Sequence, residues 1–238
     1  MKTISLCALL LAAPAVWGAT LTHDYDLTSS LNDQVGSTAL VSLGGSISGS
    51  GYTFAANQGL NLSSVLSDVG NYSILMDFSF QSLSGYRKIL DFQNLTSDTG
   101  VYNLSTDLNY YNSAFGPNGA FTANTAARVI ITRDSATQLV TGYVNGISQF
   151  SFTDSTSGAT FTGTNGIIRF FQDDNITGQN ESSAGVSTRI SIYDGALTSL
   201  EVAGLGGPQS AAPGVPEPAS FLLLGTGLVA LAFTAKRR

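Results

Sequence analysis

The densest group of side chains that could do chemistry is an acidic stretch in the C-terminal third of the chain. Asp173, Asp174 and Asn175 are consecutive. Glu181 follows a few residues later in the same glycine-containing segment. Because Ca²⁺ takes six to eight oxygen ligands of these kinds, Asp173 and Asp174 are candidate Ca²⁺ ligands. The spacing matches no EF-hand, and the alternative interpretation is an ordinary acidic loop exposed to solvent.

The glutamates show no arrangement that suits glycoside hydrolysis. A retaining glycosidase needs two carboxyl groups about 5 Å apart on either side of the scissile bond. The three glutamates lie far apart along the chain, at Glu181, Glu201 and Glu217. Asp91 with Asp98 or Asp107 would be a substitute pair, but aspartates at strand ends are more often turn formers. We therefore expect no catalytic residues in this protein.

Nucleophilic and redox chemistry also lack the side chains that they need. His23 is the only histidine, and we expect a solvated or strand-edge residue there rather than a member of a Ser/His/Asp triad. Cys7 is the only cysteine, and it lies in an apolar N-terminal stretch that we expect to be removed. The remaining chain therefore has no disulfide, thiol nucleophile or cysteine metal site.

A short aromatic group offers a candidate carbohydrate contact. Tyr110, Tyr111 and Phe115 lie beside residues with small polar or no side chains, namely Asn109, Asn112 and Gly116. Because aromatic rings stack on the apolar faces of sugar rings, the three rings would form a binding platform. The alternative is that they are strand residues with one buried face.

The elements that must position these groups are strands, because apolar residues recur with a period of two. In residues 72–80, Met76, Phe78 and Phe80 share one face. The opposite face carries Asp77 and Ser79, which predicts a half-buried strand. Similar runs between clusters of Gly, Asn, Asp and Ser predict strands at residues 86–92, 100–106, 128–133, 138–144, 147–152, 167–172 and 186–193. Many short strands of this kind predict an all-β sandwich or barrel.

Two local sequence signals predict a turn between two of these strands and a helix after the last one. Asn145 and Gly146 lie between two apolar runs, which predicts a type I′ hairpin turn because both central residues of that turn need positive φ. After the last strand, Thr198 and Glu201 have the spacing of a capping box. They predict one short helix, with Gly204 near its end.

Charge and composition limit the function further. Residues 19–218 hold six basic side chains and all sixteen acidic ones, a net charge of −10. Nucleic-acid binding needs the opposite sign. Aromatic and β-branched residues are plentiful, so these residues are expected to fold as one sizeable domain rather than to remain disordered.

Several segments, taken in order, resemble the laminin-G-like branch of the concanavalin A-like lectin/glucanase superfamily. They are residues 86–92, 98–102, 129–134, 142–146, 168–174 and 189–197. The resemblance implies a jelly-roll sandwich of two antiparallel sheets, which we assign to residues 19–205. It also implies a calcium ion at the sandwich rim in many members, and lectins, adhesion modules and hydrolases all share the fold. The chain lacks the Glu-x-Asp-x-x-Glu cluster of the retaining glucanases.

The C-terminal residues form a separate motif. An uncharged run of seventeen residues, 219–235, precedes three basic residues at the end of the chain. As a helix this run would extend roughly 25 Å, close to the thickness of a bilayer core, and the basic end would stay cytoplasmic. The four residues before the run are Val215, Pro216, Glu217 and Pro218. We expect one transmembrane sorting helix, preceded by a flexible linker at residues 206–214.

This arrangement closely resembles the PEP-CTERM signal of Gram-negative bacteria. The resemblance implies that residues 215–238 hold the protein in the inner membrane until an exosortase cuts it. Release to the cell surface or to an extracellular polysaccharide matrix would follow. The alternative is a permanent C-terminal anchor.

The N-terminal residues predict the export signal that such a tag requires. Lys2 supplies the positive charge, residues 4–16 the apolar core, and Val16, Trp17 and Gly18 a spacing that suits cleavage before Ala19. We therefore assign residues 1–18 to a signal peptide, with cleavage after Ala15 or Ala19 as alternatives.

Together these features predict an exported, non-enzymatic surface or matrix protein that is adhesive or binds carbohydrate. The expected partners are an exosortase, the inner membrane before processing and extracellular polysaccharide, but no nucleic acid. Ca²⁺ is the one cofactor considered. The alternatives are a divergent glycoside hydrolase of the same fold and a structural matrix component without a specific ligand.

Overall fold

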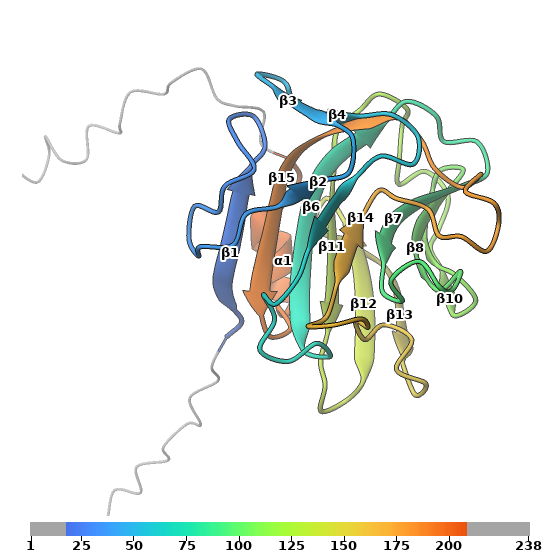
Figure 1. Cartoon of the computed structure of the whole chain (residues 1–238). Coiled ribbons are helices and arrows are strands. Elements are labelled where there is room, and N and C mark those ends of the chain that lie inside the picture. The colour runs from blue at the N-terminus through green and yellow to red at the C-terminus, as the bar shows by residue number, and fades with distance from the viewer. Residues whose placement is uncertain (1–17, 209–238) are drawn as a thin grey trace, which may run out of the picture. The chain divides into compact units, whose positions relative to one another are not determined.

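The computed structural model describes residues 18–208, which fold as two antiparallel sheets and one short helix (Figure 1). The larger sheet runs in the order β13 (Ile147–Thr153), β12 (Leu139–Val144), β11 (Ala127–Arg133), β6 (Tyr72–Phe80), β15 (Gly185–Asp194), β4 (Gly51–Phe54) and β3 (Ser46–Ser48), with β1 (Thr20–Asp26) also paired to β15. The smaller sheet runs in the order β10 (Ala114–Phe115), β9 (Asp107–Tyr110), β8 (Gly100–Leu104), β7 (Tyr86–Asp91), β14 (Ile168–Phe170), β5 (Leu60–Leu62) and β2 (Val41–Ser42). The helix is α1 (Ser199–Leu205).

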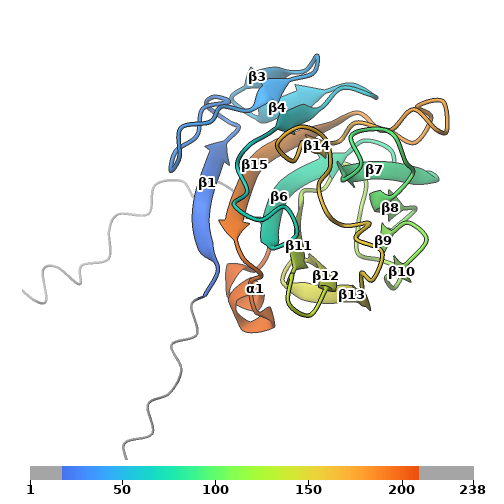
Figure 2. The same cartoon turned by 60° about the horizontal axis from the view of Figure 1, so that its bottom comes forward.

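The core lies between the two sheets and is rich in phenylalanine. Phe54 on β4 stacks on Phe171, which follows β14, with ring centroids 4.7 Å apart. Phe78 on β6 contacts the same ring at 5.1 Å. These rings bridge the two layers that Figure 2 shows from below, so burial of aromatic surface holds the sheets face to face.

The two sheets and the short helix confirm the predicted antiparallel sandwich. Each of the eight predicted strands is present, and β6 has the predicted limits. The sequence patterns missed β1 to β5, β9 and β10. Most of these strands have only two to four residues, too few to show a period of two.

The prediction of a half-buried β6 was wrong, because both of its faces are covered. Met76, Phe78 and Phe80 face the core as predicted. On the other face Asp77 is only 3 % exposed, since it pairs with Arg128 of the neighbouring β11. An acidic residue in a strand therefore marked a buried ion pair here rather than a solvent-exposed face.

The hairpin turn and the helix cap are confirmed. Asn145 and Gly146 have φ of 51° and 83°, the positive values that a type I′ turn needs. The capping box between Thr198 and Glu201 is present. The helix continues through Gly204, and Gly206 is the C-cap, one residue past the last helical position.

Three predicted segments lie outside the described residues, namely the signal peptide (except Gly18), most of the linker and the whole sorting tag. Within residues 18–208, no helix has the length and apolar character that a membrane crossing requires.

Candidate functional site

Titratable side chains gather on the outer face of the smaller sheet, where two loops cross over β7 and β8. Residues 92–99 connect these two strands, and residues 171–184 connect β14 to β15. We call this group the Lys88 cluster, and it consists of Lys88, Asp91, Asp98, Asp173, Asp174 and Glu181. Five carboxyl groups thus surround one ammonium group.

Lys88 is the centre of this cluster and is fully buried. Its Nζ donates to Asp174 Oδ2 at 2.7 Å and to the backbone oxygen of Asp98 at 3.3 Å. The ammonium also lies 4.2 Å from the centroid of the Tyr102 ring. Tyr102 donates its hydroxyl to Asp174 Oδ2 at 3.3 Å. Every close partner of the cation is therefore anionic, a hydrogen-bond acceptor or an aromatic face.

Asp173 and Asp174 hold the second loop in place. Asp173 accepts from the amides of Asp174 at 3.0 Å and Glu181 at 2.7 Å. Asp174 Oδ1 accepts from the amide of Ile176 at 2.8 Å. Both aspartates are fully buried, so the alternative interpretation of a solvent-exposed acidic loop was wrong for these two side chains.

The pKa values within the cluster are displaced in opposite directions. Burial raises the pKa of Asp98, and the neighbouring Asp174 carboxylate adds to this effect. Burial, followed by repulsion from Asp173, likewise raises the pKa of Glu181. For Asp174, burial acts upward, but the hydrogen bonds from Lys88 and Ile176 outweigh it and lower the pKa. Of these two carboxyl groups, Asp98 is therefore the weaker acid.

The Ca²⁺ hypothesis for Asp173 and Asp174 stays a prediction. Within residues 18–208 there is no group of three or more His, Cys, Asp or Glu side chains arranged to hold a metal ion. Lys88 already neutralises Asp174, and two backbone amides occupy Asp173.

We expect the melting temperature to be unchanged by millimolar Ca²⁺ and by EDTA, because these contacts already satisfy both carboxylates. An ion that bound only the folded form would instead stabilise it by about 2.7 kcal/mol at one hundred times its Kd. Thermal melts of wild type and Asp174→Asn, with Mg²⁺ as the control ion, check this. A Ca²⁺-specific rise that is smaller in Asp174→Asn would establish the site.

The structure brings together only some of the carboxylates that were considered for glycoside hydrolysis. Asp91 and Asp98 both belong to the Lys88 cluster, but Asp91 is fully buried. Asp107 lies elsewhere, at the start of β9, where it accepts from the Thr106 hydroxyl at 3.1 Å. Glu181 lies in the cluster, Glu201 caps α1, and Glu217 is outside the described residues.

The three rings of the predicted aromatic platform point in different directions. Tyr110 on β9 is buried against Phe92 and Phe152, which confirms the alternative of a strand residue. Phe115 is 61 % exposed on the edge strand β10. Tyr111 is half-buried and contacts Tyr86 and Tyr102 instead, as described next.

Tyr86, Tyr102 and Tyr111 form a group of rings that we call the tyrosine face. Their centroids are 5.4 to 6.0 Å apart, and their planes are steeply inclined to each other. Tyr102 is buried beneath, whereas Tyr86 and Tyr111 are half-buried. Burial raises the pKa of Tyr86, and Tyr111 and the carboxyl groups of Glu181 and Asp98 add to this effect; both acidic residues are partly exposed.

The sequence analysis missed both Lys88 and Tyr86 as site residues. The available signal was a lysine within the predicted strand at residues 86–92, followed directly by Ile89 and Leu90. A lysine in such a run must lie on an outer face that is solvated or supplied with anions. The sequence does not identify Asp174 as its partner, since the two residues are 86 positions apart.

His23 lies on the edge strand β1, which confirms the strand-edge interpretation. Its Nδ1 contacts the Asp33 carboxylate, and the two side chains are 13 % and 1 % exposed. The pair fastens the loop after β1, and none of the hydrogen bonds in the described part of the chain joins His23 to a serine.

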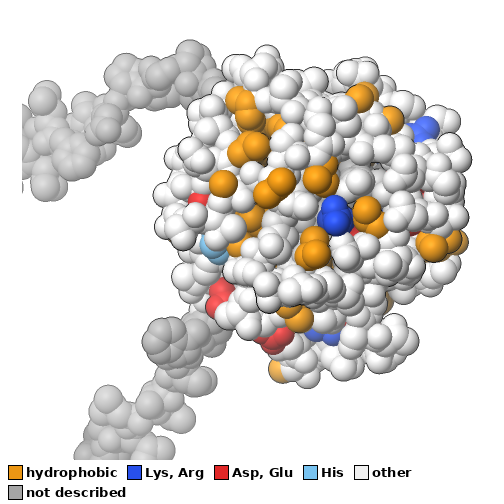
Figure 3. Space-filling model, in the orientation of Figure 1, with side chains coloured by type: hydrophobic (Ala, Val, Ile, Leu, Met, Phe, Trp, Pro, Cys, Tyr) orange, Lys and Arg blue, Asp and Glu red, His pale blue; other side chains and the backbone are white. Residues whose placement is uncertain are grey.

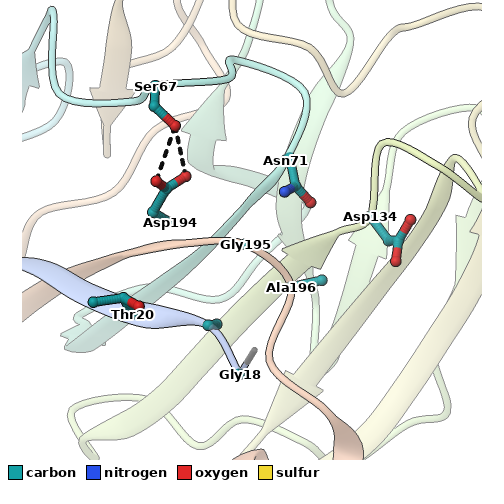
Figure 4. A pocket seen from close by; sticks show the side chains of 9 residues that line it. Gly18, Thr20, Ser67, Asn71, Asp134, Asp194, Gly195 and Ala196 are labelled. Carbon is teal, nitrogen blue, oxygen red and sulfur yellow. Dashed lines mark hydrogen bonds between the residues drawn. The ribbon is translucent and has the colours of Figure 1, made fainter. Parts of the chain in front are cut away.

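A pocket lies where β1 begins and β15 ends (Figure 4). Its volume is about 470 Å³, and its side-chain lining is polar, with Ser67, Asn71, Asp134 and Asp194. Ser67 donates to both oxygens of Asp194, at 2.8 and 2.9 Å. No aromatic ring lines the pocket, so it lacks a stacking surface for a sugar.

Comparison with known families identifies the C-terminal segment. The PEP-CTERM protein-sorting motif matches residues 214–238. The chain therefore carries a PEP-CTERM motif, which indicates exosortase-targeted export with membrane anchoring before processing. No curated protein matches the chain.

Comparison with solved structures confirms the fold. Domain 4 of AbnA, a GH43 extracellular arabinanase from Geobacillus stearothermophilus solved with arabinotriose, has a TM-score of 0.55 and 18 % identity over 79 % of this chain and 99 % of that one. The binding domain of botulinum neurotoxin serotype D scores 0.57 at 11 % identity over 78 % of this chain. Trypanosoma rangeli sialidase scores 0.57 at 14 % identity over 84 %. The chain spans 51 % of the toxin domain and 35 % of the sialidase.

Proposed function

We propose that residues 19–205 form a laminin-G-like carbohydrate-contacting module of an exported surface or matrix protein, without enzymatic activity. The observation that carries the proposal is the tyrosine face, with two half-buried rings beside the partly exposed Asp98 and Glu181. Rings supply an apolar surface for sugar C–H groups, and carboxyl groups accept hydrogen bonds from sugar hydroxyls. The similar domain of an arabinanase that was solved with arabinotriose supports this choice.

The charge of the domain supports a neutral or amino-bearing glycan over an acidic one. Four of the six basic side chains in residues 18–208 are already paired with carboxylates. The face seen in Figure 3 accordingly shows few Lys and Arg atoms. A uronic-acid polymer would meet uncompensated carboxylates and be repelled.

The proposal is tested on a glycan array with Tyr86→Ala and Tyr111→Ala. We expect each change to lower the affinity for a bound glycan roughly ten- to hundredfold, by analogy with the loss of an aromatic anchor worth about 1.5 to 3 kcal/mol. Phe115→Ala is the matched control, because that exposed ring lies outside the tyrosine face. Wild-type protein that bound no glycan would favour a structural matrix component without a ligand.

A second candidate, a divergent glycoside hydrolase, draws on the opposed pKa values of Asp98 and Asp174. Such a difference between two carboxyl groups often separates a proton donor from its partner. Asp174 is fully buried and bonded to Lys88, however, which supports the non-enzymatic proposal. Release of reducing sugar by wild type but not by Asp98→Asn would establish the hydrolase instead.

The sorting motif gives a prediction about the fate of the protein. Glu217→Ala should leave an uncut protein in the inner membrane, because it removes the charged residue between Pro216 and Pro218 in the matched motif. Cell fractionation with immunoblotting measures the location and the mass. Glu201→Ala, a change of the same type in α1, should be processed normally. Release of the Glu217→Ala protein at its usual shortened mass would contradict the prediction.

A further inference from the structure

Lys88 and Asp174 bring a primary amine next to a carboxyl carbon inside the protein. The Lys88 Nζ atom lies 2.7 Å from Asp174 Oδ2, and both side chains are 0 % exposed. Since a C–O bond of this kind is about 1.2 Å long, Nζ lies within about 4 Å of Asp174 Cγ. Reacting atoms in a near-attack geometry are about 3 to 3.5 Å apart. A small movement of either side chain therefore brings the nitrogen onto the carbon.

The surroundings hold these two groups in place and keep water away from them. The Tyr102 ring centroid lies 4.2 Å from Nζ. A Cβ on Gly100 would lie 3.2 Å from the same nitrogen, so the absence of a side chain there leaves room for the amine. The Ile176 amide holds the other oxygen of Asp174 at 2.8 Å. Fixed orientation corresponds to an effective concentration of about 10⁵ to 10⁸ M, which favours condensation of the two groups.

Asp98 adds a source of protons beside the same carboxyl group. The carboxyl groups of Asp98 and Asp174 are hydrogen-bonded to each other, which requires one proton between them. Asp98 is the weaker acid and is therefore the donor of this hydrogen bond. Its Oδ1 atom is buried, and no N–H group of the described residues donates to it. An amine, a carboxyl carbon and a proton donor thus meet at one point.

From this arrangement we propose that Lys88 and Asp174 condense into an intramolecular amide bond, with Asp98 as the proton donor. The new bond joins Lys88 Nζ to Asp174 Cγ. The bond that breaks joins this carbon to one of its two oxygens, which leaves as water. The ion pair of the structure is the state that precedes this reaction.

The protons of the reaction balance without an oxidant or a cofactor. The ammonium first passes a proton to the Asp174 carboxylate, a transfer that burial favours because it removes two charges. The nitrogen lone pair then attacks Cγ, while Asp98 donates its proton to the developing oxyanion. One carboxyl oxygen leaves as water with a proton that the nitrogen gives up, and Asp98 regains its own. An ammonium and a carboxylate have then become one amide and one water.

The amide bond gives an exported domain a covalent cross-link that does not depend on cysteine. Residues 18–208 contain no cysteine, and Lys88 is their only lysine, so no other side-chain amine competes. The two linked positions are 86 residues apart. A cross-link that closes so long a loop stabilises the protein mainly by constraining the unfolded chain. It also ties the connection between β14 and β15 permanently to β7.

Peptide mapping of the processed protein, isolated from the producing cells, tests for this bond. After denaturation, trypsin cuts after arginine and after lysine residues with a free amine. We expect one branched peptide that joins residues 88–128 to residues 170–189, with no cleavage after Lys88. Its mass should be that of the two peptides less one water, and fragmentation should place the link at Asp174. Wild-type protein that yields only unbranched peptides would overturn the inference.

Asp98→Asn tests the proton donor, because asparagine keeps the size of the side chain and a hydrogen-bond donor but has no acidic proton. It should slow bond formation by about 10²- to 10⁴-fold and so remove most of the branched peptide, while circular dichroism shows an unchanged fold. An equal yield of branched peptide in Asp98→Asn and wild type would contradict the role of Asp98.

Asp91→Asn is the matched control, since it makes the same change at another carboxyl group of the Lys88 cluster. Asp91 accepts from the Leu95 amide at 2.9 Å, and no hydrogen bond within residues 18–208 joins it to Lys88 or Asp174. The branched peptide should therefore persist. Lys88→Arg keeps the positive charge but has no amine that can be acylated, so it should abolish the branched peptide.

Discussion

Lys88→Met should destabilise the domain by about 3 to 5 kcal/mol at pH 7, the cost typical of removing one partner of a buried ion pair. The ammonium and the Asp174 carboxylate are both fully buried at 2.7 Å. Methionine fills a similar volume but leaves the buried Asp174 charge with only neutral donors, the Ile176 amide at 2.8 Å and the Tyr102 hydroxyl at 3.3 Å. Urea denaturation, monitored by far-ultraviolet circular dichroism, measures the loss of stability.

The same variant should recover stability as the pH falls. Without Lys88, burial raises the folded pKa of Asp174 above its unfolded value. Such a group favours the folded state at low pH and disfavours it as the pH rises through the folded pKa. The difference between wild type and Lys88→Met should therefore shrink between pH 7 and pH 5.

Two controls separate this effect from a general loss of packing. Arg87→Met changes the neighbouring, half-buried cation, which bonds only to backbone oxygens of Tyr86 and Asn180. This variant should lower the free energy of unfolding by about 1 kcal/mol, and that loss should depend little on pH. The double variant Lys88→Met with Asp174→Leu should be more stable than Lys88→Met alone, because no uncompensated carboxylate remains at Asp174. Equal stability of the single and double variants would contradict the buried-pair explanation.

Contacts between residues far apart in the sequence explain why the sequence predicted the sandwich but not the site. Strand β6 and the turn at Asn145 and Gly146 were predictable, because their signals lie within a few consecutive residues. The Lys88–Asp174 pair depends on the order of strands in the smaller sheet, in which β7 lies beside β14. That order follows from the global packing and leaves no local pattern.

The aromatic residues show the same limit. Tyr110 and Tyr111 are adjacent in sequence, yet one faces the core and the other the tyrosine face. Alternation along a strand predicts opposite faces, but the sequence does not say which face another strand will cover. Tyr86 joins Tyr111 only because β8 lies between β7 and β9.

Arg128→Met should also lower the free energy of unfolding by about 3 to 5 kcal/mol, because it breaks a buried ion pair on the outer face of the larger sheet. Arg128 donates from Nε and Nη2 to the two oxygens of Asp77, each at 2.7 Å, and the two side chains are 4 % and 5 % exposed. A third donor, Nη1, bonds to the backbone oxygen of Leu205 at 2.6 Å. One guanidinium group thus joins β11, β6 and the end of α1.

The matched control is Arg189→Met, which removes a similar two-point contact with Asp24 from a pair that is 43 % and 17 % exposed. Exposed pairs contribute about 0 to 1 kcal/mol, so the two variants should differ by several kcal/mol in urea denaturation. In Arg128→Met the amides of α1 should also exchange hydrogen faster, because Val202 and its apolar neighbours alone would then hold the helix. Equal losses in the two variants would show that burial of the Arg128 pair does not set its contribution.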